Sequence, residues 1–197
     1  MNLVARVQRI LFRPKQEWQA IDAEPATASA IFAGYVLPMC AIGPVASLIG
    51  LTVFGIRVPF GETLRVPLGT AVSSAVLHWV LAVVGIFVLA LLIDALAAPF
   101  GGQKSSIRSL KVAAYSSTAA WVAGIFSLVP VLSVLGLLGL YSLYLLFLGL
   151  PVLMKVPQEK ALGYTIVVVV CAIVLFIAIA MIAAIPLGLQ RLMTGRM

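Results

Sequence analysis

The sequence predicts an all-α, polytopic membrane protein, with five transmembrane helices preceded by a short N-terminal amphipathic helix at the membrane interface. The first observation is composition, because only 10% of the 197 residues are charged and the mean hydropathy is +1.18, whereas a soluble domain is roughly 25% charged. The second is that charge-free runs of about 20 residues or more, enough to cross a bilayer as helix, alternate with short charged segments. The third is that open strands in lipid leave backbone groups unsatisfied, so valine-rich runs are also expected to be helical.

Two short polar segments bracket the membrane domain. We expect residues 1–28 to be a cytoplasmic amphipathic segment, residues 29–189 the five-helix membrane domain, and residues 190–197 a short periplasmic tail. Residues 2–13 place their apolar side chains on one helical face and their arginines on another. Such a helix lies on an anionic membrane surface. The alternative is that it packs on the cytoplasmic end of the bundle.

The first span, residues 29–54, contains a candidate helix break at Pro38, Gly43 and Pro44. A proline removes one backbone hydrogen bond and clashes with the preceding turn of the helix. A helix broken near the middle of the bilayer can expose carbonyl groups to a substrate, as in many transporters. The alternative, which we favour, is a kinked helix whose freed carbonyls are satisfied by neighbouring helices.

The second span, about residues 68–97, carries two ionisable residues, His78 and Asp94. Charge is costly inside a bilayer, so Asp94 is expected to have a partner, and the plausible ones are Lys111 and Arg108 across the adjacent turn. A structural and a functional role for Asp94 both stay open. His78 is expected to make an interhelical hydrogen bond beside an interfacial aromatic residue; the alternative is a proton relay.

The run from residue 112 to residue 154 has no charge and is too long for one crossing. Pro130 divides it, so we expect a helical hairpin that supplies the third and fourth spans. The fifth span covers about residues 163–187 and follows a short charged turn.

A stripe of residues in the fourth span suggests a polar seam. At 100° per residue three hydroxyls share this stripe, so we expect it to face protein, with a glycine that permits close helix approach. The functional interpretation is a path for lipid headgroups or small polar solutes, and the alternative is helix packing. The stripe comprises Ser133, Gly136, Leu137, Tyr141, Tyr144, Leu148 and Pro151.

The distribution of Lys and Arg sets the expected orientation. Nine of the thirteen fall on the side that holds the N-terminus and the loops after the second and fourth spans. The positive-inside rule therefore places the N-terminus in the cytoplasm and the C-terminus in the periplasm. This topology gathers a candidate cytoplasmic-face cluster from separate loops: Asp94, Arg108, Lys111, Tyr115 and Lys155.

Several classes of function are not expected from these residues. The sequence has no catalytic set of nucleophile, histidine and acid, no paired acids and no phosphate-binding glycine loop. The single histidine and the two cysteines lack metal-ligand spacing, so we expect no enzyme, no metal and no cofactor. The net charge of +7 is scattered between apolar runs, which the positive-inside rule explains better than nucleic-acid binding.

Several local motifs together resemble the Yip-domain (Ypt-interacting protein) family, in particular its small enterobacterial inner-membrane proteins. An F-x-P-x-x-x-W pattern begins at Phe12, and a third-helix entry motif runs through Lys111 and Tyr115. A Y-x-x-Y-L motif with a following G-L covers residues 141–151, and Lys155-Val156-Pro157 resembles the turn into the last helix. The order and spacing of these motifs, rather than any one of them, carry the resemblance.

The resemblance implies five helices, a cytoplasmic N-terminus and no enzyme activity. Ala119 stands where family members often have proline, which puts a kink at that point in doubt. Eukaryotic relatives have a long soluble N-terminal region and act with Rab-type GTPases in vesicle traffic. Only 28 residues precede the first span here, so GTPase binding is not carried over.

Two hypotheses for function follow from the sequence. The first is a non-enzymatic protein of the bacterial inner membrane that organises membrane, lipid or partner proteins through a basic cytoplasmic face. The second is a lipid or small-solute transporter that uses the broken first helix and the tyrosine-bearing fourth helix. The expected partners are membrane lipids, with a protein partner or a second copy of the chain as a further candidate.

Overall fold

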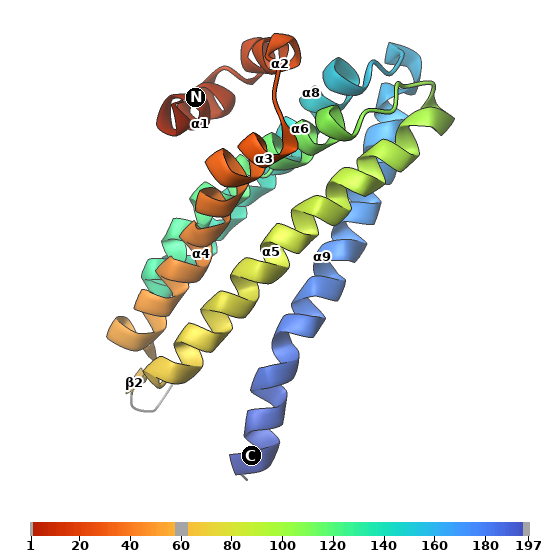
Figure 1. Cartoon of the computed structure of the whole chain (residues 1–197). Helices are drawn as coiled ribbons and strands as arrows, with labels where there is room; N and C mark the ends of the chain where they lie inside the picture. Colours follow the sequence, from red (N-terminus) through yellow and green to blue (C-terminus); the bar gives the residue numbers. More distant parts are fainter. Residues whose placement is uncertain (1, 58–62, 195–197) are drawn as a thin grey trace.

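The computed structural model describes the backbone of residues 2–57 and 63–194, and the side chains of residues 2–55 and 65–182. Long helices run side by side, and two short helices, α1 (Leu3–Phe12) and α2 (Pro14–Ala23), lie across one end of the bundle (Figure 1). We call residues 2–26 the N-terminal cap, the end that it covers the capped end, and the opposite end the far end.

The first long element is one continuous helical span with irregular turns at both ends. Two π-helical turns, at which the backbone bonds to the fifth residue rather than the fourth, flank the α-helical middle. Its parts are α3 (Ala28–Ile31), η1 (Phe32–Val36), α4 (Leu37–Ile49) and η2 (Gly50–Phe54). It ends at Gly55, whose φ of 70° is a conformation that glycine adopts without strain.

A short loop connects this span to the second one. It contains two strands, β1 (Ile56–Arg57) and β2 (Thr63–Leu64), which pair antiparallel with Ile56 opposite Leu64. The second span is α5 (Leu68–Ala97), continued by the 3₁₀ turn η3 (Ala98–Phe100). The bounds of α5 agree with those predicted from the sequence.

The segment after α5 forms the predicted hairpin, but its first arm is interrupted. This arm consists of α6 (Ser106–Ser116), α7 (Thr118–Ala123) and the 3₁₀ segment η4 (Gly124–Leu128). The second arm consists of the 3₁₀ segment η5 (Pro130–Leu140) and α8 (Tyr141–Met154). The arms pack against each other, α6 on α8 and both α7 and η4 on η5.

The interruption lies at Ser117, although no proline is nearby. The hydroxyl of Ser117 donates to the carbonyl of Ala113 at 2.8 Å, and that of Thr118 donates to the carbonyl of Tyr115 at 2.6 Å. Serine and threonine that bond back to the preceding turn bend helices. The helix is therefore interrupted at Ser117, two residues before Ala119, although the proline that the resemblance led us to look for is missing.

The last element, α9 (Gln158–Thr194), packs along α5. Four helices are long and apolar enough to cross a membrane within the described part of the chain: Ala28–Phe54, Leu68–Phe100, Pro130–Met154 and Gln158–Ile182. The interrupted arm 106–128 is not among them because no single helix in it is long enough. The count of five spans stays a prediction, as does the position of α1 at a membrane interface. The expected tail reaches residues 195–197, which lie outside the described residues.

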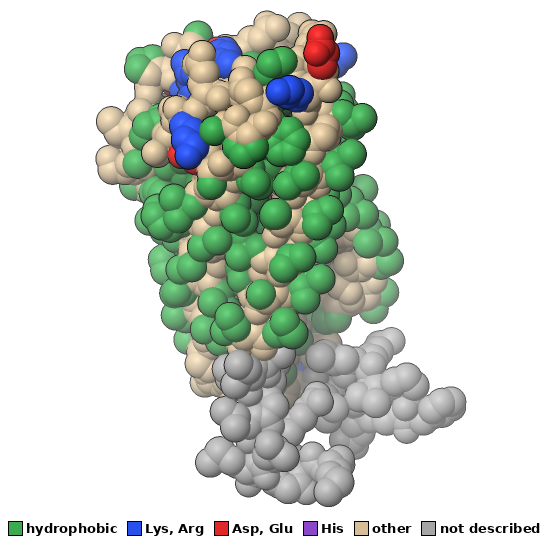
Figure 2. Space-filling view, turned by 90° about the vertical axis from the view of Figure 1, so that its right-hand side faces the viewer, with side chains coloured by type: hydrophobic (Ala, Val, Ile, Leu, Met, Phe, Trp, Pro, Cys, Tyr) green, Lys and Arg blue, Asp and Glu red, His purple; other side chains and the backbone are tan. Residues whose placement is uncertain are grey.

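The surface matches the predicted membrane location. Figure 2 shows apolar side chains along the side of the bundle, with charged side chains gathered at the capped end. The buried core runs from the cap into the bundle and includes Ile10, Trp18, Tyr35, Ile93 and Leu150. Within the described residues, the chain is therefore an apolar bundle whose capped end is rich in charge.

Candidate functional site

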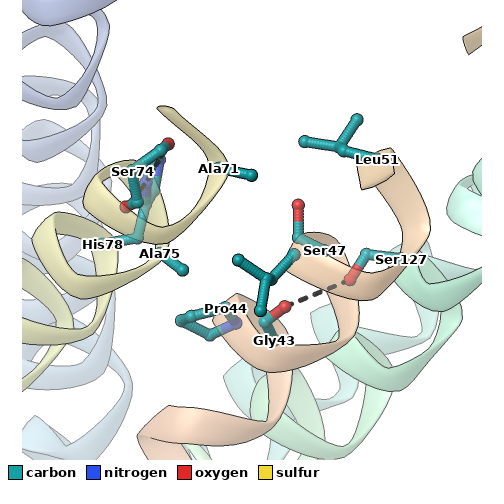
Figure 3. A pocket seen from close by; sticks show the side chains of 10 residues that line it. Gly43, Pro44, Ser47, Leu51, Ala71, Ser74, Ala75, His78 and Ser127 are labelled. Carbon is teal, nitrogen blue, oxygen red and sulfur yellow. Dashed lines mark hydrogen bonds between the residues drawn. The ribbon is translucent and has the colours of Figure 1, made fainter. Parts of the chain in front are cut away.

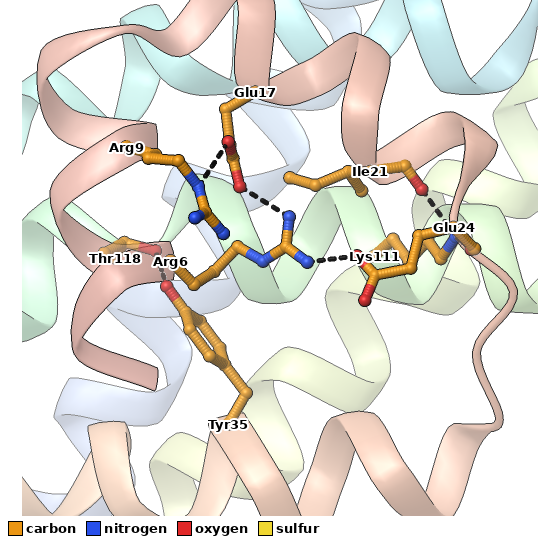
Figure 4. Close-up of polar contacts among 8 residues, drawn as sticks. All are labelled: Arg6, Arg9, Glu17, Ile21, Glu24, Tyr35, Lys111 and Thr118. Carbon is orange, nitrogen blue, oxygen red and sulfur yellow. Dashed lines mark hydrogen bonds and ion pairs between the residues drawn. The ribbon is translucent and has the colours of Figure 1, made fainter. Parts of the chain in front are cut away.

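Arg6 lies at the centre of a buried ion-pair network in the cap (Figure 4). Its side chain is 4% exposed and donates to the carboxylates of Glu17, at 2.5 Å, and Glu24. Arg9 donates from its Nε to the second oxygen of Glu17 at 2.9 Å. Burial alone would lower the pKa of Arg6, but the carboxylates of Glu24 and Glu17 more than offset it and raise that pKa. The guanidinium therefore stays charged and joins α1 to α2.

Lys111 connects the cap to α6. Its buried Nζ donates to the backbone carbonyls of Ile21, at 2.7 Å, and Glu24, at 2.5 Å. These carbonyls lie at the C-terminal end of α2, where helices leave acceptors without partners inside the helix and lysine is favourable. Burial lowers the pKa of Lys111, and the carboxylates of Glu24 and Asp22 act against this shift.

Trp18 is the apolar anchor of the cap. Its ring is fully buried and lies against Gly149 of α8. A Cβ at position 149 would lie within 2.6–2.8 Å of three ring atoms, closer than real Cβ atoms come to other heavy atoms. Pro14 begins α2 at its first turn, where a missing N–H costs nothing. The Phe-x-Pro-x-x-x-Trp pattern thus sets the start of α2 and inserts its tryptophan into α8.

Aromatic rings carry the network from the cap into the bundle. The guanidinium carbon of Arg6 lies 5.6 Å from the centre of the Tyr115 ring, within cation–π range. The Tyr115 ring meets Tyr35 edge-on at 4.7 Å. The hydroxyls of Tyr35 and Thr118 form a hydrogen bond of 2.7 Å between the first span and α7.

The turn that follows α8 fixes the other side of the capped end. Lys155 has a φ of 54°, which is uncommon for a residue with a Cβ. Its Nζ forms an ion pair of 2.5 Å with Asp22 of α2. The N–H of Gln103 donates to the carbonyl of Met154 at 2.8 Å, so the loops after α5 and α8 pair with each other.

The structure brings part of the predicted cytoplasmic-face cluster to the cap. Lys111, Tyr115 and Lys155 all contact it or its ion pairs. Asp94 instead accepts the backbone N–H of Ser105 at 2.7 Å. The predicted pairing of Asp94 with Lys111 or Arg108 is wrong, since no salt bridge among the described side chains includes Asp94.

Arg108 and His78 make local contacts. The Nη1 of Arg108 donates to the side-chain carbonyl of Gln103 at 3.1 Å. The Nδ1 of His78 lies 2.8 Å from the carbonyl of Ser74, one turn earlier in α5. The predicted interhelical hydrogen bond of His78 is thus an intrahelical one. The neighbouring Trp79 makes the interhelical bond, to the carbonyl of Leu37 at 3.0 Å.

The predicted polar seam faces outward. Ser133, Tyr141 and Tyr144 are all exposed, and the hydroxyl of Ser133 returns to the carbonyl of Pro130 at 2.7 Å. The expectation that this stripe faces protein is wrong. Its first part lies in the 3₁₀ segment η5, which buries no side chain, and its tyrosines lie in the α-helix α8 with exposed rings.

Other residues of the second arm make the inward contacts. A Cβ added to Gly136 would have no neighbouring atom within 4 Å. Gly139 makes the close approach instead, to Ala120, and the hydroxyl of Ser142 accepts the N–H of Ala120 at 2.9 Å. Tyr141 belongs to the cap, since its hydroxyl donates to the carbonyl of Leu11 at 3.1 Å.

The candidate helix break is wrong as well. The span Ala28–Phe54 is continuous, with Pro38 in the first turn of α4, after the π-turn, and Pro44 inside α4. Gly43 packs against Gly124 of η4, whose added Cβ would lie 2.9 Å from the Gly43 Cα. Carbonyls near these residues accept from other helices, that of Leu37 from Trp79 and that of Gly43 from Ser127, as the favoured alternative expects.

The outward face of α1 combines apolar and basic side chains. Phe12 is 82% exposed and Val4 is 62% exposed, although the opposite face buries Ile10. Arg13 and Lys15 are also exposed, beside Phe12 in sequence. The cap thus neutralises its inward charges and leaves basic and apolar groups outside.

A comparison with protein families decides the identity of the fold. The model of the Yip1 domain matches residues 9–179. The chain belongs to the Yip1 domain family. The match begins inside the cap and covers the whole bundle down to α9.

The curated relatives agree with this assignment. The chain is 26% identical over 166 residues to "Inner membrane protein YohC" of Escherichia coli strain K12, covering 82% of this chain and 85% of the relative. The protein of the same name from Escherichia coli O6:H1 gives the same figures. No solved structure matches the chain.

The residues that carry the family likeness converge on one place. Trp18, Lys111, Tyr115, Gly149 and Lys155 come from four separate motifs, and all of them hold the cap on the bundle. Glu17 and Glu24, their charged counterparts, were not singled out from the sequence. The only signal was their position in a segment that is otherwise rich in arginine. The docked cap is therefore the candidate functional site of this Yip1-family membrane protein.

Proposed function

We propose that this protein is a non-enzymatic, multi-pass protein of the bacterial inner membrane that organises anionic lipid through the outward face of its N-terminal cap. The observation that carries the proposal is the sorting of charge in the cap. Arg6 is paired with carboxylates and Lys111 with carbonyls, whereas Arg13 and Lys15 are exposed beside the 82% exposed Phe12.

The outward face has the chemistry of an interfacial helix. Exposed aromatic and aliphatic side chains enter the headgroup boundary, and basic residues are attracted to anionic lipid by about 1 kcal/mol each. Tyr141, which is bonded to the end of α1, has a partly exposed ring beside the ring of Tyr144. Tyrosines are enriched at that depth of the membrane.

The orientation is part of the proposal. We place the cap in the cytoplasm and let about residues 112–128 cross as an interrupted third span, which gives five crossings and a periplasmic C-terminus. This arrangement keeps nine of thirteen Lys and Arg on the cytoplasmic side. A reporter fused after Met197 should report the periplasm, and a cytoplasmic signal would refute it.

The lipid proposal is tested by native mass spectrometry of protein purified from bacterial membranes. The double variant Arg13→Gln, Lys15→Gln removes two cations from the cap face. The matched control Lys104→Gln, Lys160→Gln removes two exposed cations elsewhere. The cap variant should retain about 30-fold less phosphatidylglycerol, for two contacts of about 1 kcal/mol each. Equal retention in both variants would overturn the proposal.

Transport of a lipid or solute has less support. Its two structural supports were a broken first helix and an inward tyrosine seam, and the helix is continuous while Tyr144 lies outside. A flux assay in liposomes that gives reproducible flux lost in Tyr144→Phe would favour transport over the organising function.

A further inference from the structure

A polar cavity lies in the half of the bundle away from the cap (Figure 3). It has a volume of about 230 Å³ and lies between α4, the start of α5 and η4. A single water needs only roughly 10–15 Å³ of such space, so the cavity can hold a larger group. Its polar lining consists of Ser47, Ser74, His78 and Ser127.

The lining offers hydrogen bonds without net charge. It contains no Asp, Glu, Lys or Arg among the described residues. The hydroxyl of Ser127 is already used as a donor, to the carbonyl of Gly124 at 2.6 Å. The hydroxyl of Ser47, a half-buried residue, has no hydrogen bond to another described residue, so it can bond to a group that enters the cavity. The Nδ1 of His78 faces a carbonyl and must carry the proton, so its Nε2 is an acceptor in the neutral ring.

An apolar groove adjoins this cavity. It has a volume of about 250 Å³, and its lining presents no polar surface. Val45, Val72 and Val76 lie at its outer edge with 43–54% of their surfaces exposed, on the side of the bundle that faces lipid in the proposed orientation. Pro44, Leu48 and Ala75 line both spaces, so the polar cavity and the groove lie next to each other.

We infer that the two spaces together bind one neutral acylglycerol, with its glycerol–ester group in the cavity and an acyl chain in the groove. A glycerol hydroxyl can donate to His78 Nε2, and an ester carbonyl can accept from Ser47. A charged headgroup is disfavoured because the described lining residues hold no counter-charge for a buried ion. Binding sites that are mostly apolar with a few placed polar groups are typical of small-molecule ligands. This site is separate from the cap and independent of its proposed function.

The test uses photo-crosslinking of the full-length protein in nanodiscs with a diacylglycerol that carries a diazirine in one acyl chain. Ser74→Leu fills the cavity and removes one hydroxyl. Ser73→Leu makes the same change at the preceding position of α5, where Ser73 is exposed and lines neither space. Ser47→Val is a second, smaller variant that removes a hydroxyl from α4. Helicity and size-exclusion profiles establish that each variant is folded.

The wild-type protein and Ser73→Leu should be labelled mainly within residues 41–48 and 72–79. Ser74→Leu and Ser47→Val should lose labelling roughly tenfold, as expected for the loss of one or two hydrogen bonds. Equal labelling of all four proteins, or labelling spread evenly over the lipid-facing helices, would overturn the site. A diazirine fatty acid without glycerol, if it labels the groove with the same dependence on Ser47, would overturn the assignment to an acylglycerol.

Discussion

The capped end of the bundle is joined by long side chains, whereas the far end is joined by backbone contact. At the capped end, Arg6, Lys111 and Trp18 reach between elements that are distant in sequence. At the far end, Gly50 packs so closely that an added Cβ would lie 2.4 Å from the carbonyl oxygen of Ser127. Contacts between charged side chains, as in the cap, depend on charge and pH. Close backbone contacts, as at Gly50, depend only on the volume of the side chain at that position.

This difference separates two roles in one bundle. The far end sets the spacing of α4 against η4 by sterics, and it retains a polar cavity beside that contact. The capped end is a docked part whose attachment can be weakened without rebuilding the helices. The following changes test this contrast, beginning with the largest expected effect.

Arg6→Met should release the cap. Removing one partner of a buried ion pair costs about 3–5 kcal/mol, because it leaves the buried Glu17 carboxylate with only the half-exposed Arg9 as a cation and Glu24 with none of its present ion pairs. Hydrogen–deuterium exchange of the α2 amides should accelerate more than about 100-fold. The control Arg13→Met removes an exposed arginine and should change exchange little. Equal acceleration in the two variants would contradict the central position of Arg6.

Gly50→Ala should destabilise the far end by about 1–3 kcal/mol, because the atoms in its way belong to the backbone of Ser127 and Leu128 and cannot rotate aside. Unfolding in mixed micelles, followed by far-ultraviolet circular dichroism, measures the loss. Gly136→Ala is the control, since it has open space and should be neutral. The contact would be refuted if the two variants unfolded at the same detergent fraction.

Docking of the cap should strengthen with pH in the alkaline range. Burial lowers the pKa of Lys111 in the docked state, whereas an undocked lysine titrates near about 10.4. The docked state therefore binds fewer protons below that value, and docking gains at most about 1.4 kcal/mol per pH unit. Because intrinsic exchange itself changes with pH, protection factors of the α2 amides are the measure. Lys111→Met should flatten the dependence of these protection factors on pH. An unchanged dependence would exclude Lys111 as its source.

Tyr141→Phe should have the smallest effect. It removes the hydrogen bond to the carbonyl of Leu11 and costs about 0.5–1.5 kcal/mol. Exchange of the amides at the end of α1 should rise about tenfold at most, while that of α2 stays unchanged. Tyr144→Phe is the matched control at the neighbouring ring. A larger effect from Tyr144→Phe would show that the ring pair, rather than the hydrogen bond, holds α1.

Most of the fold could be predicted because lipid imposes strong constraints on composition and length. The bounds of α5 and the hairpin between residues 112 and 154 follow from apolar runs, charge and Pro130. The 3₁₀ geometry of η5 could not be predicted, since an apolar run carries no signal for three rather than 3.6 residues per turn. The stripe drawn through Ser133, Tyr141 and Tyr144 at 100° per residue therefore crosses a change of helix type at Tyr141, and all three residues are exposed.

The site could be predicted only in part for a different reason. Lys111, Tyr115 and Lys155 were grouped by topology, because the loops of one membrane side must meet. Their contacts with Glu24, Arg6 and Asp22 depend on how the cap folds back over the bundle. The periodicity of one helix does not predict a contact between α2 and α8. The packing of Trp18 against Gly149 could therefore not be predicted from the sequence.

The seat of Trp18 also bears on biogenesis. Trp18 leaves the ribosome well before Gly149, which belongs to the second arm of the hairpin and lies more than a hundred residues later in the sequence. The ion pairs of Glu17 and Glu24 lie within the N-terminal segment and can form early, but Trp18 has no seat and Asp22 has no Lys155 until α8 is in place. Closure of the cap is then a late step of assembly, and a nascent chain that stops before α8 presents an open segment to whatever quality control inspects the membrane.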